Sequence, residues 1–580
     1  MKRKATLIRI LGYLLRCKGQ LFLILGLSLL GNLLSLAGPE ISGTAINFIS
    51  DGAASGQMNM PLISRYCVFL FFLYASSSIL SYVVNVSMIS LSRKVTYNLR
   101  KEMFNRLVTL PVSFFDQNTT GDILSRISYD IDTVNASLAN DVVQVLTSSV
   151  TIFGSLVMML SICPVLVLVF AVTIPLALVL ATYLTRMVQP MFRARSRAAG
   201  ELNGFVEEMI SGQKTLRVYT QEERVIDEMN VQNKKLVDAY YKTDYYASIM
   251  GPSTNAINNL ALALISIFGA ILYLRGQIDI GGISAFVLYS RKFTGPIREL
   301  AEIYGELQSS LAAAERVFRV LDEEPEPADL PGAENLQNVE GQVELSHVNF
   351  GYTKDRVILK DFSMKAEKGN LIAIAGPTGA GKTTFINLLM RFYDIQNGKI
   401  LVDEKDASMI TRKSLRLTYS MVLQDTWLFY GTIYENIGYG RPDATREEVI
   451  AAAKAAHIHH YIESLPQGYD TLLIDDGANI SKGQKQLLTI ARALLMKTPM
   501  LILDEATSNV DTRTEHQIQA AMRNLMQDKT CFVVAHRLST IRNADCILVI
   551  RDGNVVERGT HEELLALKGF YYEMHQAQYR

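Results

Sequence analysis

The sequence predicts two unlike parts: an α-helical transmembrane bundle of six spans with long cytoplasmic helix extensions, then an α/β P-loop NTPase domain. Long apolar runs recur through residues 1–321 of the 580-residue chain, and a glycine-rich loop follows an apolar strand at 376–384. An acidic, proline-rich segment separates the two parts. We therefore expect a membrane domain at 1–321, a linker at 322–340 and a nucleotide-binding domain at 341–580.

Composition narrows the class of protein. Hydrophobic residues make up 49% of the chain, whereas Lys+Arg and Asp+Glu both total 57, so net charge gives no indication of a nucleic-acid partner. The five cysteines show neither CxxC pairs nor metal-ligand spacing, which favours small buried hydrophobes in a reducing compartment. They are Cys17, Cys67, Cys163, Cys531 and Cys546.

The membrane spans follow from apolar length and from the placement of basic residues. A helix needs about 20 apolar residues to cross the hydrocarbon layer, and most of the runs are that long. The basic N-terminus has no signal-peptide cleavage pattern and is expected on the cytoplasmic side, with the nucleotide-binding domain. Basic and uncharged connections then alternate, as expected of a multi-pass protein of the cytoplasmic membrane. The six spans are expected near 20–49, 62–88, 139–161, 164–187, 247–274 and 280–305.

The fifth and sixth spans contain polar groups that suggest a water-filled cavity. Arg291 and Lys292 interrupt the sixth span, where a cation facing lipid costs about 2.5–3.5 kcal/mol. Asn255, Asn258 and Asn259 lie at helical spacing in the fifth. The alternative is interhelical hydrogen bonding by the amides and snorkelling by the cations. A cavity lined by these groups suits amphipathic anions or lipid headgroups.

Two polar connections are predicted to be helices that extend well beyond the membrane. The segments 92–138 and 188–244 are rich in Glu, Arg, Lys and Gln at helix-compatible spacing and lack the Gly/Ser character of flexible linkers. Such extensions suit a protein that transmits motion between its membrane part and its second domain.

The glycine-rich loop predicts phosphate binding. The apolar strand 370–375 is followed by GPTGAGKTT and then by a helical pattern, which is the context that supports a G-x-x-x-x-G-K-[ST] loop. Backbone N–H groups converge on phosphate oxygens, Lys382 adds a positive charge, and the Thr383 hydroxyl offers a ligand for Mg²⁺. The nucleotide-contacting loop comprises Gly376, Pro377, Thr378, Gly379, Ala380, Gly381, Lys382, Thr383 and Thr384.

A second apolar strand ends in two adjacent carboxylates. Asp504 is placed to hold Mg²⁺, and Glu505 beside it can orient and polarise an attacking water, which indicates ATP hydrolysis rather than transfer to an acceptor. His536 follows a third strand at its carboxyl end, where ligands bind in open α/β sheets. We predict Glu505 and His536 as catalytic residues, with His536 contacting the γ-phosphate.

These motifs resemble those of ATP-binding cassette (ABC) exporter half-transporters of the multidrug and lipid type, over almost the whole chain. The segment SKGQKQLLTIARALL at 481–495 resembles the signature helix of that family. By the same resemblance, Gln424 is the glutamine-loop residue that links Mg²⁺ and water to the membrane domain, and Tyr352 stacks on adenine. Residues 508–511 match the loop that crosses between subunits, and two segments containing LPVSFFDQ and LRVYTQEE match the coupling helices.

The resemblance implies a dimer with shared ATP sites. In this family the signature helix of one subunit closes on the γ-phosphate held by the P-loop of its partner. Ser481, Gly483 and Gln484 would then contact the partner's ATP, helped by the N-terminal dipole of their helix. ATP and Mg²⁺ are the implied cofactors, and Thr383, Gln424 and Asp504 are the implied Mg²⁺ ligands.

The signature departs from the commonest form, LSGGQ, at two positions. Ile480 replaces Leu, a mild change, and Lys482 replaces the first Gly. Lys482 can point to solvent, or it can weaken one of the two ATP sites. The second interpretation favours a heterodimer with another half-transporter over a homodimer.

The expected function is ATP-driven export of a small amphipathic substrate (drug, lipid or peptide) by alternating access. A regulatory or sensor ATPase that transports nothing is the alternative from another class, and a lipid flippase is the alternative within transport. No protease domain precedes the first span, which disfavours a peptide-processing exporter, and the fusion of both domains in one chain disfavours an importer. The sequence does not identify the cargo.

Overall fold

The structure is a computed structural model, and it describes residues 3–353, 356–424, 426–474, 476–477, 479–504, 511–534 and 541–578. These residues divide into two compact units. The first unit comprises Met1–Val108 and Thr120–Glu323, and the second comprises Thr109–Thr119 and Glu324–Arg580. The chain therefore passes into the second unit twice, first briefly at 109–119 and then for good at 324.

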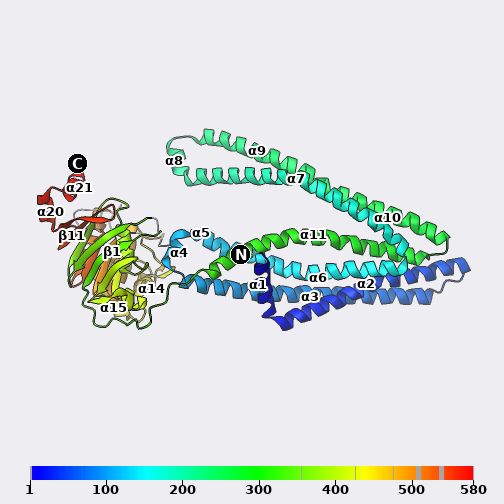
Figure 1. Cartoon of the computed structure of the whole chain (residues 1–580), viewed down its shortest axis with the longest axis horizontal. Coiled ribbons are helices and arrows are strands. Elements are labelled where there is room, and N and C mark those ends of the chain that lie inside the picture. Colours follow the sequence, from blue (N-terminus) through cyan, green and yellow to red (C-terminus); the bar gives the residue numbers. More distant parts are fainter. Residues whose placement is uncertain are drawn as a thin grey trace. The chain divides into compact units, whose positions relative to one another are not determined.

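The first unit is built from long helices. α3 has 50 residues and extends about 75 Å at 1.5 Å per residue, more than twice the hydrocarbon thickness. Long helix extensions beyond the membrane are thereby confirmed. In Figure 1, α7 and α9 run side by side and the short α8 lies at the turn between them. The helices up to residue 322 are α1 (Arg3–Leu15), α2 (Lys18–Ser55), α3 (Met60–Thr109), α4 (Val112–Gln117), α5 (Thr120–Ser125), the π-helical turn η1 (Arg126–Asp130), α6 (Ile131–Ile162), α7 (Pro164–Ser211), α8 (Gln213–Val218), α9 (Glu222–Ser248), α10 (Met250–Leu274) and α11 (Ile280–Asp322).

Five stretches of the described chain are long and apolar enough to cross a membrane, and they contain the first five expected spans. The sixth expected span, 280–305, is a continuous part of α11 but is absent from this group of described helices. Arg291 and Lys292 interrupt its apolar stretch, so its place in the bilayer depends on neighbouring helices rather than on its own hydropathy. The five stretches are Lys18–Ser55, Met60–Thr109, Thr120–Ile162, Pro164–Ser211 and Glu222–Leu274.

α11 packs against α2 and α6 at the centre of the first unit. Gly43 and Gly281 allow α2 and α11 to meet backbone to backbone, since a Cβ added at Gly43 would lie 2.6 Å from the Gly281 carbonyl oxygen. Tyr289 is fully buried and donates a 2.6 Å hydrogen bond to the carbonyl of Leu36. Burial of these aromatic and aliphatic side chains fixes α11 between its two neighbours.

Ion pairs hold the polar ends of these helices. The buried Asp130 accepts two hydrogen bonds from Arg316 of α11, at 2.8 and 2.5 Å, which is the bidentate geometry that guanidinium and carboxylate groups favour. Arg9 of α1 pairs with Asp322 at the end of α11 at 2.7 Å. The end of α11 is thus tied to two separate parts of the first unit.

The second unit contains a six-stranded, mainly parallel sheet and a smaller antiparallel one. The larger sheet has the strand order β12-β11-β3-β10-β9-β6, and the smaller has β2-β1-β4-β5. A third, two-stranded sheet pairs β7 with β8. The strands are β1 (Val343–Phe350), β2 (Leu359–Ala366), β3 (Leu371–Ala375), β4 (Asn397–Val402), β5 (Lys405–Asp406), β6 (Tyr419–Val422), β7 (Gly431–Thr432), β8 (Leu472–Leu473), β9 (Met500–Asp504), β10 (Thr530–Val534), β11 (Cys546–Arg551) and β12 (Asn554–Gly559).

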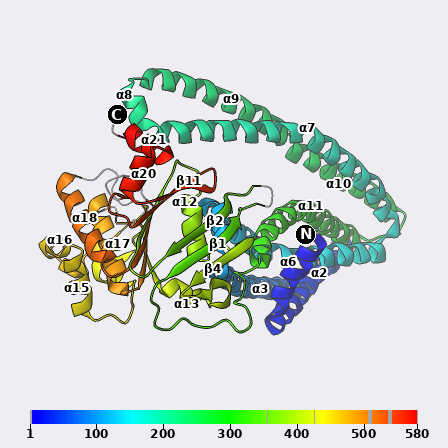
Figure 2. The same cartoon turned by 60° about the vertical axis from the view of Figure 1, so that its left-hand side comes forward.

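Helices cover the parallel sheet and form two hydrophobic cores with it. One core contains α12 and the smaller sheet, and the other contains α14 to α18. Figure 2 shows β1, β2 and β4 grouped apart from α15–α18. The predicted fold class, a helical membrane bundle followed by an α/β domain, is confirmed. The remaining helices are α12 (Lys382–Leu389), η2 (Ala407–Met409), α13 (Arg412–Leu417), α14 (Ile433–Gly438), α15 (Arg446–Ala455), α16 (His459–Ser464), η3 (Gly468–Asp470), α17 (Lys482–Met496), α18 (Thr512–Met526), α20 (His561–Leu567) and α21 (Phe570–Gln578).

The cysteines meet the expectation of burial only in part, since Cys17 and Cys546 are half-buried. Cys163 and Cys531 are buried, as predicted, and all five thiols are free. Cys67 is exposed on α3, so the prediction of a buried hydrophobe is wrong there. Cys67 lies in an apolar stretch expected to cross the membrane, where an exposed thiol faces lipid or another helix rather than water.

The close approach of α2 and α11 predicts an asymmetric response to alanine. We expect Gly43→Ala to destabilise the protein by about 1–3 kcal/mol, because its methyl group meets backbone that cannot move without separating the helices. Gly26→Ala is the matched control on the same helix, where an added Cβ meets nothing within 4 Å. The measurement is the thermal midpoint of purified protein in detergent, followed by circular dichroism. Equal midpoints for the two variants would contradict the prediction.

Candidate functional site

The phosphate-binding loop lies between β3 and α12. Gly376 has a φ of 156°, and a Cβ there would collide with the carbonyl oxygen of Ile550 on the neighbouring β11, so this turn requires glycine. α12 begins at Lys382, so the N–H groups of its first turn face the loop. The strand, loop and helix therefore occur in the order that the sequence predicts.

Lys382 is held over the loop. Only 6% of the residue is exposed, and its Nζ donates hydrogen bonds to the carbonyls of Gly376 at 2.7 Å and Pro377 at 3.1 Å. Thr383 is exposed on the first turn of α12, whereas Thr384 is buried. Lys382 and Thr383 thus present an ammonium group and a hydroxyl group at the same helix N-terminus.

Two more predicted residues share this edge of the sheet through strand register. Val422 of β6 pairs with Leu503 of β9, Leu503 with Val533 of β10, and Val533 with Ala373 of β3. Gln424 follows β6, and Asp504 ends β9. Because these strands are parallel, the glycine-rich loop, Gln424 and Asp504 all lie at their carboxyl ends, where α/β sheets bind ligands.

Tyr352 lies beside the loop helix. Its hydroxyl donates to Thr384 Oγ1 at 3.2 Å and accepts from Asn387 Nδ2 at 3.1 Å. Its ring meets that of Tyr393 edge-on, with centroids 4.9 Å apart, and 44% of the residue is exposed. The exposed part of the ring is available to stack on a base, as the resemblance implies.

The signature helix α17 starts with a complete capping box. Ser481 N–H donates to Gln484 Oε1 at 2.8 Å, and Gln484 N–H donates to Ser481 Oγ at 3.3 Å. Gln484 therefore uses its side-chain oxygen within its own helix, and the Ser481 hydroxyl keeps its proton for another acceptor. Gly483 is buried, while Lys482 is exposed and leaves the helix start undistorted.

Polar contacts join α17 to the segment that follows Gln424. Arg492 donates to the carbonyls of Asn436 at 2.9 Å and Trp427 at 3.1 Å, and burial lowers its pKa. Asp476 accepts from Leu428 N–H at 2.8 Å and from Lys485 Nζ at 3.1 Å. A shift of the segment after Gln424 would therefore displace the signature helix through these hydrogen bonds.

Some predicted residues lie outside the described part of the chain. These are the two predicted catalytic residues, Glu505 and His536, together with residues 508–510 of the predicted crossing loop. Asp511, the last residue of that loop, caps α18 by accepting from Thr514 N–H at 3.0 Å. The same backbone hydrogen bond lowers the Asp511 pKa.

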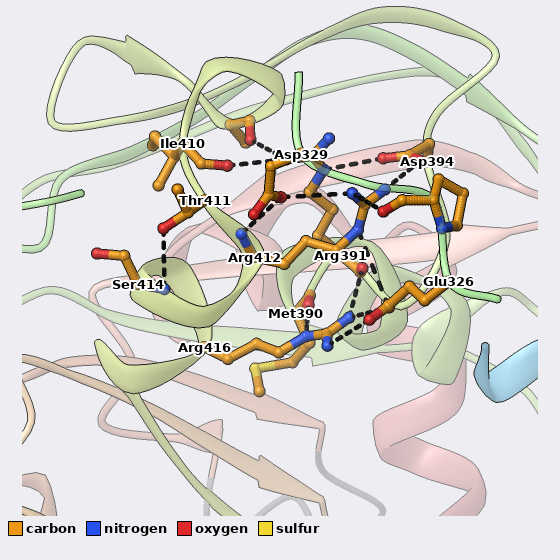
Figure 3. A network of polar contacts seen from close by, with 12 residues as sticks. Glu326, Asp329, Met390, Arg391, Asp394, Ile410, Thr411, Arg412, Ser414 and Arg416 are labelled. Atoms are coloured by element: carbon orange, nitrogen blue, oxygen red, sulfur yellow. Dashed lines mark hydrogen bonds and ion pairs between the residues drawn. The ribbon is translucent and has the colours of Figure 1, made fainter. Parts of the chain in front are cut away.

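The predicted linker is clamped to the second unit by arginines (Figure 3). Arg416 donates to both carboxylate oxygens of Glu326, at 3.1 and 2.5 Å, and Arg412 donates to the Pro327 carbonyl at 2.8 Å. Asp394 bridges Arg391 and Arg412 at 2.8 and 2.6 Å, and both arginine side chains are only 8% exposed. The proline-rich composition does indicate a connection without regular structure, but this connection is anchored rather than free.

The first predicted coupling helix, α4, belongs to the second unit. Asp116 of α4 accepts a 2.5 Å hydrogen bond from the Tyr393 hydroxyl, and burial together with this bond raises the Tyr393 pKa. Glu326 N–H donates to the Thr109 carbonyl at 2.8 Å. The coupling segment and the linker are therefore joined directly to each other and to neighbouring residues of the second unit. The second predicted coupling segment, 216–223, starts within α8, in which no residue is buried, and ends in the first turn of α9.

The polar groups predicted to line a membrane cavity differ in their surroundings. Lys292 donates to Ser35 Oγ at 2.6 Å, so its ammonium group is engaged within the bundle. Arg291 is exposed and forms no ion pair with any described residue. Asn255 and Asn259 are also exposed. Of the two cations, Arg291 is the one that could meet a ligand without giving up an existing contact.

Sequence reasoning missed Glu40, an acidic residue in the first span. It follows Gly38 and Pro39 in an otherwise apolar stretch of α2. An ionisable residue within a membrane span is rare and is by default a candidate functional position. The signal was visible in the sequence, because Gly-Pro-Glu interrupts the apolar run.

This architecture defines an ATPase domain fused to a helical membrane domain, with the phosphate loop and signature helix of an ABC protein. Residues 21–297 match the family described as ABC transporter transmembrane region, and residues 359–508 match the family described as ABC transporter. The chain belongs to the ABC transporter family and is an exporter half-transporter.

Relatives and a solved structure agree with this assignment. The chain is 41% identical to an uncharacterised ABC transporter ATP-binding protein of Bacillus subtilis, covering 99% of this chain and 94% of that protein. It is 46% identical over 485 residues to a fatty acid ABC transporter ATP-binding/permease protein of Mycobacterium bovis, covering 84% and 76% of the two chains. A bacterial Atm1-family ABC exporter with ATP bound superposes with a TM-score of 0.78 at 30% identity, covering 97% of this chain and 98% of that one.

From the ion pairs of Asp394 with Arg391 and Arg412, we predict a measurable loss of stability when Asp394 is neutralised. Asp394→Asn neutralises the carboxylate that the mostly buried Arg391 and Arg412 share. Arg412 keeps Asp329 at 3.5 Å and Asp394 is half exposed, so we expect a loss of about 1–2 kcal/mol. Asp528→Asn is the control, since Asp528 is exposed and its positive φ suits asparagine equally well. Thermal unfolding of both variants in detergent checks the prediction, and a shift in the control as large as in Asp394→Asn would refute it.

Proposed function

We propose that this chain is one half of a dimeric exporter of the cytoplasmic membrane that moves an amphiphile with a hydrocarbon body and a polar head. The observation that carries the coupling is the Asp116–Tyr393 hydrogen bond, which attaches the first coupling helix next to the helix that starts at the phosphate loop. Nucleotide-driven motion of that helix then reaches the long helices of the same chain. The N-terminus and the ATPase domain lie on the cytoplasmic side.

The ATP site also fits Mg²⁺. Thr383, Gln424 and Asp504 offer hydroxyl, amide and carboxylate oxygens, which are the hard donors that Mg²⁺ prefers alongside phosphate oxygens. All three come from one edge of the parallel sheet. Bound Mg²⁺ would neutralise the β- and γ-phosphate charge, while Lys382 and the N–H groups of the loop hold the phosphates.

Glu505 is proposed as the residue that orients the attacking water. It directly follows Asp504, which ends β9 at the carboxyl edge of the parallel sheet, where α/β sheets bind ligands. His536 follows β10, the strand between β9 and β3, and is proposed to contact the γ-phosphate from there.

Each ATP site is proposed to be shared by two chains. Ser481 caps α17 with its lone pair and retains its hydroxyl proton, while the N–H groups of Lys482 and Gly483 in the first turn have no acceptor within the helix. These donors suit the γ-phosphate held by the glycine-rich loop of the partner. Because Lys482 departs from the commonest signature, we propose a heterodimer with a second half-transporter.

The proposed cargo carries an anionic head. Arg291 supplies an unpaired cation within the sixth span, and the mycobacterial relative is described as a fatty acid transporter. A carboxylate or phosphate head meeting Arg291 would gain a charge-assisted hydrogen bond in a medium of low dielectric constant.

Removal of the proposed water-orienting carboxylate should separate ATP binding from hydrolysis. We expect Glu505→Gln to lower ATPase turnover by about 10²–10⁴-fold, the range that general-base assistance contributes, with ATP affinity retained. Turnover is measured by phosphate release in proteoliposomes, and affinity by binding of a fluorescent ATP analogue. Glu562→Gln, an exposed change on α20, is the control. Retained turnover in Glu505→Gln would remove this residue from the mechanism.

Shared sites predict a specific result when two defective copies are expressed together. Lys382→Ala disables the glycine-rich loop and Ser481→Arg blocks the signature helix. A dimer of one copy of each holds one doubly defective site and one intact site. Random self-pairing would place such mixed pairs in about half of the dimers, with a corresponding recovery of ATPase activity.

The heterodimer predicts the opposite outcome, which we expect: no recovery from the two defective copies, because this chain does not pair with itself. Tagged wild-type chain isolated from its native cells should then carry a second, distinct half-transporter in equal amount. Recovery of activity in the co-expression would contradict the heterodimer and establish a homodimer with composite sites.

A further inference from the structure

Glu40 lies in the first span with its charge unmatched. Its side chain is exposed, and its carboxylate forms no hydrogen bond or ion pair with any described residue. An acidic side chain in a membrane span is costly unless water, a ligand or another charged group compensates it. Glu40 is therefore a candidate for ligand recognition.

Two polar side chains of α11 that reach this part of α2 are already engaged. The Tyr289 hydroxyl donates to the Leu36 carbonyl, and Lys292 donates to Ser35 Oγ. Pro39, which has no N–H, leaves the backbone carbonyl four residues earlier without a helical donor, so this part of α2 is a break in the regular ladder. α11 thus donates one hydrogen bond to the α2 backbone and one to the Ser35 side chain, while the Glu40 carboxylate accepts none from any described residue.

A cavity of about 580 Å³ opens beside Glu40, between α2 and α6. Leu33, Leu36, Phe153 and Val157 give it an apolar lining. Among the described residues that line it, Ser149 is the only other polar side chain besides Glu40, and its hydroxyl donates to the Val145 carbonyl at 2.7 Å. The cavity therefore combines an apolar wall with one unpaired negative charge.

We infer that this cavity binds an amphipathic cation, whose apolar body packs against Leu33, Leu36, Phe153 and Val157 and whose positive head pairs with Glu40. Charge complementarity selects the occupant, because a carboxylate in surroundings of low dielectric constant attracts a cation and repels an anion. The inference rests on the proposed export of an amphiphile and adds a second class of head group, recognised apart from the anion at Arg291.

The size of the cavity sets the length of the apolar body. The lining residues of α2 extend over one face of about two helical turns, roughly 10 Å, which corresponds to an alkyl chain of about eight to ten carbons. Decyltrimethylammonium and decanoate carry the same chain with heads of opposite charge. They form a matched pair of probes for the two head-group sites.

The experiment measures stimulation of ATPase activity in proteoliposomes by each probe, with the complete transporter. We expect Glu40→Gln to raise the half-stimulating concentration of decyltrimethylammonium about tenfold or more and to leave that of decanoate unchanged. Glu40→Asp, which keeps the charge, should retain most of the response to the cation. Leu33→Trp, which fills part of the cavity and keeps Glu40, should also weaken the ATPase response to decyltrimethylammonium.

Arg291→Ala separates this inference from the proposed anionic cargo. It should weaken the response to decanoate only. If Arg291→Ala changes nothing while Glu40→Gln weakens the cation response, the anionic cargo fails and the cation site stands. Equal responses of the wild type and Glu40→Gln to decyltrimethylammonium, or equal losses for both probes, would overturn the cation site. If Glu40→Gln fails to fold, Glu40→Asp and Leu33→Trp test the site instead. A weaker response to decyltrimethylammonium in Leu33→Trp alone supports the site. An unchanged response in both variants overturns it.

Discussion

The parallel register of β3, β10, β9 and β6 is the constraint on which the nucleotide chemistry depends. Each strand ends at the same edge, so residues that are distant in sequence arrive beside one nucleotide without further adjustment. The glycine-rich loop, Gln424 and Asp504 owe their proximity to this register rather than to contacts among themselves. A slip of one residue in β9 would turn Asp504 to the other face of the sheet and remove a proposed Mg²⁺ ligand.

α12 carries that constraint to the coupling helix and the linker, the two segments through which the chain passes into the second unit. It begins at Lys382, ends at Leu389, and is about 12 Å long. The residues directly after it, 390–394, hold the linker through the arginine clamp and the coupling helix through Tyr393. If α12 moves as a rigid body, a displacement at the glycine-rich loop would reach both segments through these contacts. The hydrogen bond from Glu326 N–H to the Thr109 carbonyl also joins the linker to the residue that ends α3, just before the coupling helix.

Sequence reasoning succeeded where the physical signal is local. The glycine-rich loop, the strand that ends in Asp504 and the capped start of α17 are each specified within about 15 residues. The arginine contacts that hold the linker could not be predicted, because Arg412 and Glu326 lie far apart in sequence and only the folded chain brings them together. The surroundings of Lys292 were missed for the same reason, since nothing near it in sequence indicates Ser35. Glu40 could have been identified from the sequence, because a proline and an acidic residue within an apolar run are themselves a local signal.

The membrane part combines satisfied and unsatisfied charges, and the difference is informative. Asp130 and Lys292 have partners inside the bundle, so their side chains are explained by helix packing. Arg291 and Glu40 have none among the described residues, and a charge without a partner persists in a membrane only where water, a ligand or another chain compensates it. The two residues carry opposite signs and do not pair with each other. A cargo with one charged head group can pair with Arg291 or with Glu40 but not with both. An exporter that contains both residues can therefore pair with head groups of either sign.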